Sequence, residues 1–326
     1  MKKIYGNEYL CATLASMTAN NKAAHSVLFF GEKGLGKKLM AKFYTELLLC
    51  ENPINGAPCG TCRSCRNIEN GFHPDVVYAP TSGKLGGYSV ETARSICSDA
   101  FIMPNNSSGK KVYLFCDCHK MDTRTQNTLL KLIEEPPDYA YFIFTSESKS
   151  DFLPTIISRC VCFGLSVCTE EETKNALIDD GCSEKDAVEA INCFHGNIGQ
   201  CLAFLNDGNL RQTVDLTKSI ADSIIRRDEY MLNTALFTLG KERDAVRNTL
   251  SLLDKLVRDA AVLGKDKNSA VIGCYRDGAV KLSTMITVYQ AARMHKFIEK
   301  AWNTIEFNVN IPLTLAALSG EMINCL

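Results

Sequence analysis

The sequence lacks a strong net charge, a long hydrophobic run and any internal repeat. Its 36 basic and 37 acidic residues give a formal net charge of −1, so no overall field draws the chain to nucleic acid or to a membrane surface. No apolar run approaches the roughly 18 residues of a membrane-spanning helix. The N-terminal stretch MKKIYGNEYL also lacks the apolar core of a signal peptide. We therefore expect a cytoplasmic protein that makes no membrane contact.

Cysteine, in contrast, is abundant, and four of the 16 cysteines are closely spaced. Most of the others stand singly in apolar stretches and are typical of small buried residues in a reducing compartment. The four are Cys50, Cys59, Cys62 and Cys65. Two-residue spacers let successive sulfurs converge on one ion, and a set without histidine, carboxylate or open position favours structural zinc. The alternatives are unpaired surface thiols or a C-x-x-C redox pair.

A phosphate-binding loop is predicted in Ser26–Lys38 (SVLFFGEKGLGKK), where an apolar strand pattern runs into a helical pattern. The predicted nucleotide-binding positions of this loop are Gly31, Gly34, Gly36 and Lys37. Glycines let backbone N–H groups turn toward phosphate oxygens, and a lysine adds a positive charge. Lys38, however, stands where G-x4-G-K-[ST] requires a hydroxyl that holds Mg²⁺. The loop looks suited to a nucleotide but not to its hydrolysis; the alternative is an ordinary glycine-rich turn.

Two further candidate positions follow predicted strands. Lys111–Cys116 ends at Asp117, where a carboxylate beside a phosphate loop could coordinate Mg²⁺. The glutamate that would polarise a water molecule is expected next, and the residue there is Cys118. Tyr141–Phe144 ends at Thr145, whose hydroxyl is placed to sense a γ-phosphate or to cap the following turn.

The alternation of apolar strands and amphipathic helices predicts an α/β domain with a parallel, helix-covered sheet. A helix is expected over Val90–Met103, and the strand signal fades from Val167 onward. Asn206–Gly208 is read as a linker into an almost wholly helical remainder. The predicted domains are 1–166 with a cysteine module at 50–65, a helical lid over 167–207 and an all-α domain over 208–326.

Several segments carry motifs that are specific in combination. Besides the cysteine module, they are Asn127–Pro137 (NTLLKLIEEPP), Ser158–Cys160 (SRC), Gly71–Val76 (GFHPDV) and Phe307–Leu313 (FNVNIPL). Together they resemble the bacterial sliding-clamp loader subunits of the AAA+ family, over nearly the whole chain. The resemblance implies a RecA-like AAA+ domain, a three-helix lid and a helical collar. It also implies a ring formed with motor (gamma/tau) and delta subunits, which acts on a sliding clamp and primed DNA.

Departures from the family pattern indicate the type of subunit. A motor subunit of the family is expected to carry a hydroxyl after the loop lysine, an acidic pair after the second strand and a basic residue in the lid. This chain has Lys38, Cys118 and Gly199 there. The pattern resembles the delta-prime type of DNA polymerase III subunit, which has no ATPase cycle of its own. The alternative is an active AAA+ motor that tolerates these residues, and whether ATP and Mg²⁺ bind stays open.

The resemblance also gives Arg159 a role. The arginine of the SRC motif resembles an arginine finger that reaches the ATP site of a neighbouring subunit. A planar, permanently charged guanidinium can offset negative charge that develops on a γ-phosphate. Ser158 and Cys160 would then fix its direction. The alternative for Arg159 is a surface arginine that pairs with a nearby acid.

Overall fold

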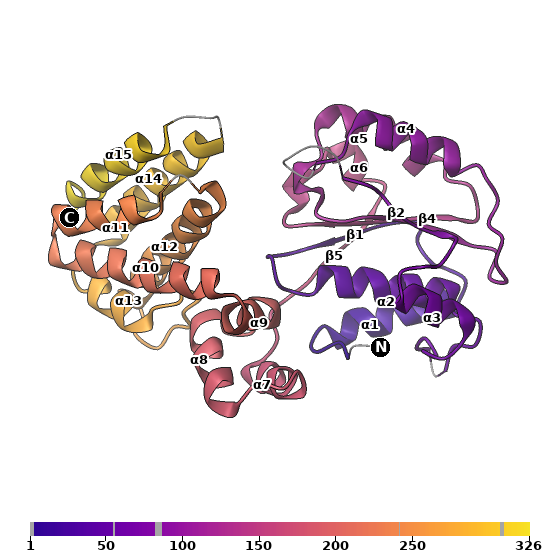
Figure 1. Ribbon diagram of the computed structural model, residues 1–326, viewed down its shortest axis with the longest axis horizontal. Coiled ribbons are helices and arrows are strands. Elements are labelled where there is room, and N and C mark those ends of the chain that lie inside the picture. Colours follow the sequence, from indigo (N-terminus) through magenta and orange to yellow (C-terminus); the bar gives the residue numbers. More distant parts are fainter. Residues whose placement is uncertain (1–2, 55, 82–86, 241, 307–309) are drawn as a thin grey trace. The chain divides into compact units, whose positions relative to one another are not determined.

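The computed structural model describes residues 3–54, 56–81, 87–240, 242–306 and 310–326 (Figure 1). The chain divides into two compact units, Met1–Glu172 and Thr173–Leu326. The first unit contains all the strands described, and the second is built from helices. None of the helices in the described residues is both long and apolar enough to cross a membrane.

A five-stranded sheet in which every neighbouring pair is parallel forms the centre of the first unit. In chain order the strands are β1 (Ser26–Phe30), β2 (Val76–Tyr78), β3 (Lys111–Phe115), β4 (Ala140–Ser146) and β5 (Val161–Gly164). Their spatial order is β2-β3-β4-β1-β5. The sheet confirms the predicted parallel α/β fold. The strand β5 was missed because it is a short, partly exposed edge strand with no strong apolar pattern.

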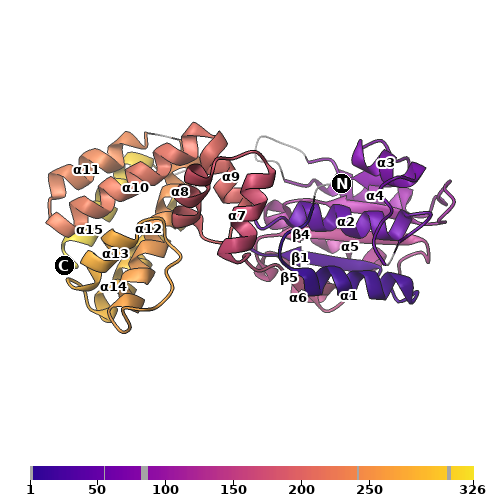
Figure 2. The same ribbon diagram turned by 90° about the horizontal axis from the view of Figure 1, so that it is seen from below.

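Helices cover both faces of this sheet (Figure 1). One face carries α1 (Glu8–Ala19), α2 (Lys37–Leu49) and α3 (Arg63–Glu69), and Figure 2 shows α1 beside α2. The other carries α4 (Val90–Asp99), α5 (Thr123–Glu134) and α6 (Pro154–Ile157), and 3-10 turns span Cys118–Lys120 and Lys149–Asp151. The helix predicted to reach Met103 ends at Asp99 instead. The apolar side chains beyond this end are exposed, namely those of Phe101, Ile102 and Met103, so no core contact extends the helix. Pro104 follows, and the residue before a proline disfavours helical geometry.

Alternate residues of the central strands enter two separate apolar cores. Leu28, Tyr113 and Phe142 pack with α4 and α5 residues on one face. Val27 and Ile143 pack with residues of α1 and α2 on the other. Since successive side chains of a strand point to opposite faces, a sheet buried on both faces needs continuous apolar strands, as the sequence has here.

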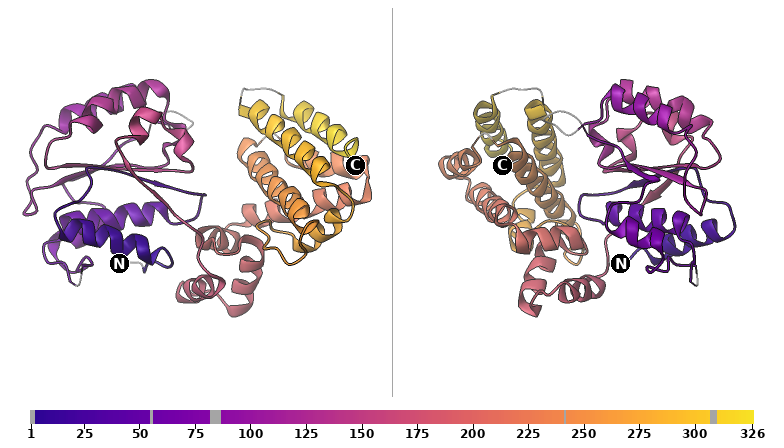
Figure 3. Two further views of the ribbon diagram at one scale, coloured as in Figure 1. Left: turned by 180° about the vertical axis from the view of Figure 1, so that it is seen from behind. Right: turned by 45° about the vertical axis from the view of Figure 1, so that its right-hand side comes forward.

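The second unit is helical, and Figure 3 shows its longer helices packed side by side. Its helices, the first of which begins at the end of the first unit, are α7 (Glu170–Asp179), α8 (Glu184–Phe194), α9 (Ile198–Asn206), α10 (Gly208–Arg226), α11 (Glu229–Thr238), α12 (Arg243–Leu263), α13 (Arg276–Ser283), α14 (Val288–Glu306) and α15 (Ile311–Ile323). The three short helices predicted after Val167 are present. Asp207 caps α10 directly after α9 ends, and Phe204 shares an apolar cluster with Val214 across the expected linker.

Side-chain caps mark the starts of two helices in this region. The Thr169 hydroxyl accepts the Glu172 N–H, and the Glu172 carboxylate accepts the Thr169 N–H, which is a reciprocal capping box. The Ser183 hydroxyl accepts the Asp186 N–H at the start of α8. Of the Phe307–Leu313 motif, residues 307–309 lie outside the described residues, and Asn310 caps α15 by accepting the Leu313 N–H.

Candidate functional site

The predicted phosphate loop connects β1 to the N-terminus of α2. Gly31, Gly34 and Gly36 have φ angles of 146°, 95° and 83°, a region that side-chain-bearing residues rarely adopt. A Cβ atom at Gly31 would also lie 3.0 Å from the Leu165 carbonyl oxygen. Gly36 is the N-cap of α2, and the first N–H groups of a helix have no partner within it. The backbone therefore has the shape that the sequence predicted for an anion-binding turn.

Lys37 is folded back onto this loop. Its Nζ donates to the carbonyl oxygens of Gly31, at 2.6 Å, and Glu32, at 2.8 Å. The residue is only 7% exposed, and burial lowers the pKa of its ammonium. In this conformation the charge expected to meet a phosphate instead holds together the carbonyl groups of its own loop.

Lys38 and Asp117 are brought together from two elements. Asp117 follows the third strand with a left-handed φ of 58°, and its Oδ2 lies 2.6 Å from the Lys38 Nζ. The hydrogen bond with Asp117 raises the pKa of Lys38. The residue that stands in place of the metal-binding hydroxyl is thus ion-paired with the carboxylate predicted to bind the metal.

Thr145 lies in β4, and its side chain has no exposed surface. Its Oγ1 accepts the Asp117 N–H at 2.9 Å. Because β4 lies between β3 and β1 in the sheet, this hydrogen bond fixes the Asp117 backbone beside the loop. Sequence reasoning placed Asp117 and Thr145 after predicted strands but did not foresee the contact between them.

Cys118 lies where a water-activating glutamate was expected. It has no exposed surface, and its thiol donates to the Phe115 carbonyl oxygen at 3.3 Å. Burial raises its pKa well above the usual value for cysteine. A buried neutral thiol cannot take a proton from a water molecule beside a phosphate.

Arg159 follows α6, and its guanidinium makes local contacts. Its Nη2 lies 2.8 Å from Oε1 of Glu134, the last residue of α5. Its Nη1 donates to the Thr155 carbonyl oxygen at 3.0 Å and to the Ser158 hydroxyl at 3.3 Å. The Arg159 side chain nevertheless stays 34% exposed. Ser158 thus contacts the guanidinium. The Glu134 contact, which crosses 25 residues, is the pairing with a nearby acid named as the alternative for Arg159, although the sequence did not identify Glu134 as that acid.

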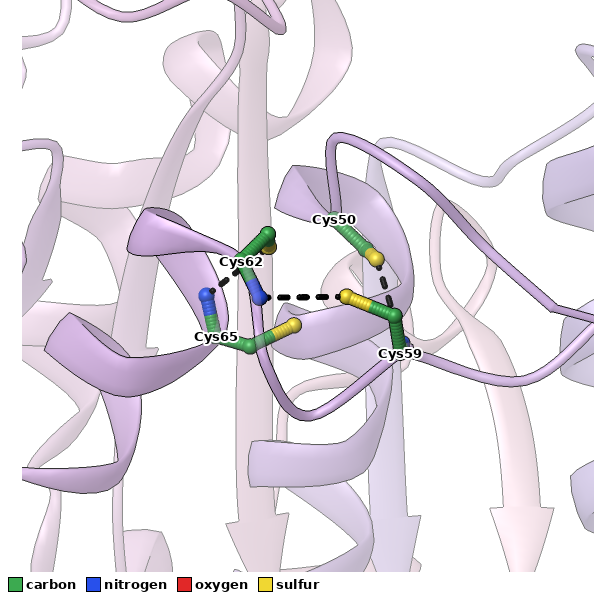
Figure 4. A group of neighbouring side chains, drawn as sticks. All are labelled: Cys50, Cys59, Cys62 and Cys65. Atoms are coloured by element: carbon green, nitrogen blue, oxygen red, sulfur yellow. Dashed lines mark hydrogen bonds between the residues drawn. The ribbon is translucent and has the colours of Figure 1, made fainter.

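The four cysteines converge at the C-terminal end of α2 (Figure 4). Cys50 is the C-cap of α2, and Cys62 is the N-cap of α3. All four Sγ atoms lie within 4.8 Å of one another. In a tetrahedron with metal–sulfur bonds of about 2.3 Å, the sulfur atoms are about 3.8 Å apart. The spacing therefore nearly matches a four-thiolate metal site.

Backbone N–H groups also point at these sulfur atoms. The amides of Cys59, Cys62 and Cys65 donate to the Sγ atoms of Cys50, Cys59 and Cys62, at 3.3 to 3.4 Å. Hydrogen bonds from backbone amides, that of Thr61 first, lower the pKa of Cys59 to about 6, whereas burial raises the pKa values of Cys50 and Cys65. Such donors stabilise thiolates, which are the metal-binding form of cysteine. The donor set fits a metal ion such as Zn²⁺.

Glu51 and Ile68 support the cysteine module, and neither was noticed in the sequence. The Ser64 N–H and hydroxyl both donate to the Glu51 carboxylate, at 3.3 and 2.9 Å. Ile68 of α3 is buried in the apolar core that includes α2. The module is thus attached to the sheet domain through α2 and α3.

Comparison of the sequence with known proteins finds subunits of DNA polymerase III. Residues 6–169, half of the chain, match the family described as DNA polymerase III, delta subunit. DNA polymerase III subunit tau of Escherichia coli is 29% identical over 256 residues, which cover 78% of this chain and 37% of tau. Subunit gamma of Buchnera aphidicola subsp. Schizaphis graminum is 32% identical over 176 residues, or 54% of this chain and 47% of gamma. The chain therefore spans less than half the length of these relatives.

Solved structures of related description are also found. A DNA polymerase III gamma-subunit-related protein of Thermotoga maritima has a TM-score of 0.41 at 16% identity, covering 95% of this chain and 98% of that protein. The Bacillus subtilis clamp loader delta protein has a TM-score of 0.35 at 8% identity, covering 96% of this chain and 99% of that one. Similarity this low adds nothing to the assignment, which depends on the family match. On that match, the chain belongs to the family described as DNA polymerase III, delta subunit.

Proposed function

We propose that this chain is a delta-prime-type subunit that does not hydrolyse ATP and supplies Arg159 to the ATP site of a neighbouring subunit. Its partners would be the motor (gamma/tau) and delta subunits and, through the complex, the sliding clamp and primed DNA. The domains would be a RecA-like AAA+ domain over 1–166, a lid over 167–207 and an oligomerising collar over 208–326. The protein would act in the cytoplasm.

The state of the hydrolytic positions carries this proposal. The Lys38 ammonium is paired with Asp117 at 2.6 Å, and Cys118 is a buried thiol bonded to a carbonyl oxygen. Hydrolysis by this class of fold needs a metal ion that bridges the phosphates and a group that positions the attacking water. Neither a hydroxyl ligand nor a water-activating acid is available at these positions, so intrinsic turnover is not expected.

Arg159 is proposed as the group that the chain contributes to catalysis. A guanidinium is always charged and presents its N–H donors in a rigid fork that matches phosphate oxygens. Supplied in trans, such an arginine raises phosphoryl-transfer rates by about 10³–10⁵. The Glu134 contact turns the side chain toward the C-terminal end of α5, and the Arg159 side chain as a whole stays 34% exposed, which supports access from outside the chain.

The test is reconstitution with the motor and delta subunits, followed by measurement of ATP hydrolysis in single turnover. With Arg159→Ala, we expect the rate at the neighbouring site to fall by about 10³ or more, with complex assembly unchanged. Arg159→Lys is the matched control, since it keeps the charge but loses the fork, and we expect it to restore little. Wild-type hydrolysis with Arg159→Ala would refute the assignment.

An active motor subunit is the second candidate. It is favoured by curated relatives that are named tau and gamma and by the presence of Lys37 in a loop of the expected shape. In that case the isolated chain would hydrolyse ATP, and Lys37→Ala would abolish the activity. The ATPase rate of the isolated chain therefore separates the two candidates.

We also propose that the cysteine cluster holds one structural Zn²⁺ ion. Four sulfur ligands would fill a tetrahedral site and leave no position for a substrate or water. The bound ion would hold the short helix α3 and its connection to α2, a module too small to form its own core. Metal analysis of the purified chain should find about one zinc per chain; a metal-free chain that folds equally well would contradict the proposal.

A further inference from the structure

We propose that the Lys38 ammonium replaces Mg²⁺ at the phosphate loop and thereby excludes a divalent cation from it. The proposal deepens the non-hydrolysing part of the proposed function and is independent of Arg159. It concerns the metal ion that phosphate loops of this type use, and the residues present here do not fit that ion.

The geometry of the carboxylate is the first argument. Lys38 Nζ lies 2.6 Å from Asp117 Oδ2, whereas Mg²⁺ binds oxygen ligands at about 2.0–2.1 Å in an octahedron. An ammonium at this distance occupies the space that an ion bound to the same oxygen would need. The Asp117 backbone is itself fixed by Thr145, which keeps Asp117 beside the start of α2, where Lys38 lies.

The number of available ligands is the second argument. The hydroxyl that would contribute a metal ligand is absent at position 38, and the Thr145 Oγ1 accepts the Asp117 N–H. A divalent cation at Asp117 would therefore meet the Lys38 ammonium while gaining no side-chain ligand from position 38.

Two features act against a bound cation: the Lys38–Asp117 ion pair and the absence of a hydroxyl at position 38. The side chains of the pair are 64% and 49% exposed, so solvent screens the pair. Two substitutions at position 38 distinguish the Lys38 charge from the missing hydroxyl. Lys38→Met removes the charge without adding a ligand, whereas Lys38→Thr removes the charge and adds the hydroxyl.

The experiment measures ATP affinity of the full, zinc-loaded chain with and without Mg²⁺, by calorimetry in buffers freed of other divalent ions. We expect Mg²⁺ to give the wild type no gain in ATP affinity. It should strengthen ATP binding by Lys38→Thr by about tenfold or more, and by Lys38→Met by less. Asp117→Asn added to Lys38→Thr should remove the gain. Because Lys38 is mostly exposed, its variants should fold, which circular dichroism will verify.

Two outcomes would overturn the inference. One is a wild-type chain whose ATP binding is strengthened by Mg²⁺ as much as that of Lys38→Thr. The other is a Lys38→Thr chain that gains no Mg²⁺-dependent binding. Mn²⁺ binding to the ATP complex, followed by electron paramagnetic resonance, gives an independent reading of the same variants. Hydrolysis is not required in either measurement, since Cys118 remains, so failure here leaves the trans role of Arg159 to its own test.

Discussion

Helix α2 has a potential ion site at each end, and the two sites differ in how many of the expected ligand groups are present. At its N-terminus the phosphate loop has the glycine geometry of an anion site, but Lys38 and Cys118 stand where catalytic ligands are needed. At its C-terminus Cys50 joins three other cysteines whose sulfur atoms all lie within 4.8 Å of one another. The phosphate loop lacks the hydroxyl ligand expected at position 38, whereas the cysteine cluster brings four candidate ligands together.

The difference between the two sites distinguishes residues that maintain the fold from residues that ATP hydrolysis would need. The loop still connects β1 to α2 through internal bonds of Lys37 and Lys38, so the fold can be kept without the ligand. In the cysteine cluster the internal contacts are amide hydrogen bonds to three sulfur atoms, and the proposed Zn²⁺ would add the bonds that join all four. We therefore expect the fold to depend more on the cysteine cluster than on a ligand at the phosphate loop.

The largest effect is expected at the cysteine end. Cys65→Ser removes a buried ligand, and structural Zn²⁺ contributes about 10–16 kcal/mol in comparable small sites. We expect loss of bound zinc and fast amide hydrogen exchange over residues 50–70, with the sheet protected. Cys97→Ser is the control, since that thiol lies outside the cluster. Equal zinc content in Cys65→Ser and Cys97→Ser would contradict the assignment of Cys65 as a metal ligand.

The loop end should respond in stability rather than activity. Lys37→Ala removes an ammonium that bonds two carbonyl oxygens, and hydrogen bonds to charged groups contribute about 1.5–3 kcal/mol. We expect a loss of that order in the unfolding free energy, measured with urea. ATP hydrolysis by the reconstituted complex should stay within about twofold of wild type, since a motor loop is where such a lysine acts. Loss of ATP hydrolysis by the complex with Lys37→Ala would show that this loop takes part in nucleotide binding or catalysis.

A smaller effect is expected for the partner of Arg159. Glu134→Gln breaks an exposed pair, so the unfolding free energy should change by less than about 1 kcal/mol. The guanidinium loses one of its fixed contacts, and we expect a several-fold change in hydrolysis by the complex. The matched control is Glu135→Gln, one residue along at the α5 C-cap. Identical rates for both variants would remove Glu134 as a positioning residue.

The smallest effect provides a measure of exposed ion pairs such as Lys38–Asp117. In the second unit, His295 Nδ1 lies 2.7 Å from Asp254 Oδ1, and this contact raises the histidine pKa. The stabilisation should be complete below about pH 6.5 and be lost as pH rises through the raised pKa. We expect less than about 1 kcal/mol. Urea unfolding on both sides of that range, against Asp254→Asn, gives the value; a pH-independent difference would contradict it.

Much of the fold followed from sequence because its signals are local. Apolar strand patterns, glycine positions and capping residues such as Thr169 depend on neighbours within a few residues. The cysteine cluster was also predictable, since its spacing alone brings the sulfur atoms together. The edge strand Val161–Gly164 was missed because tertiary pairing with β1, rather than its own pattern, makes it a strand.

The electrostatic state of the site was not predictable in the same way. Sequence showed that Lys38 and Cys118 departed from the motif, but not that Lys38 pairs with Asp117 or that Cys118 is buried. Glu134 gave no signal, because its contact with Arg159 depends on how α5 packs beside α6. Such contacts come from the packing of distant elements, and single-residue patterns do not encode them.

The most direct test of the central claim is the ATPase rate of the isolated chain, assayed with Mg²⁺. The account predicts no turnover above that of Lys37→Ala, because the chain lacks the hydroxyl ligand and the water-activating acid. Sustained hydrolysis that disappears in Lys37→Ala would contradict it and identify the chain as a motor subunit.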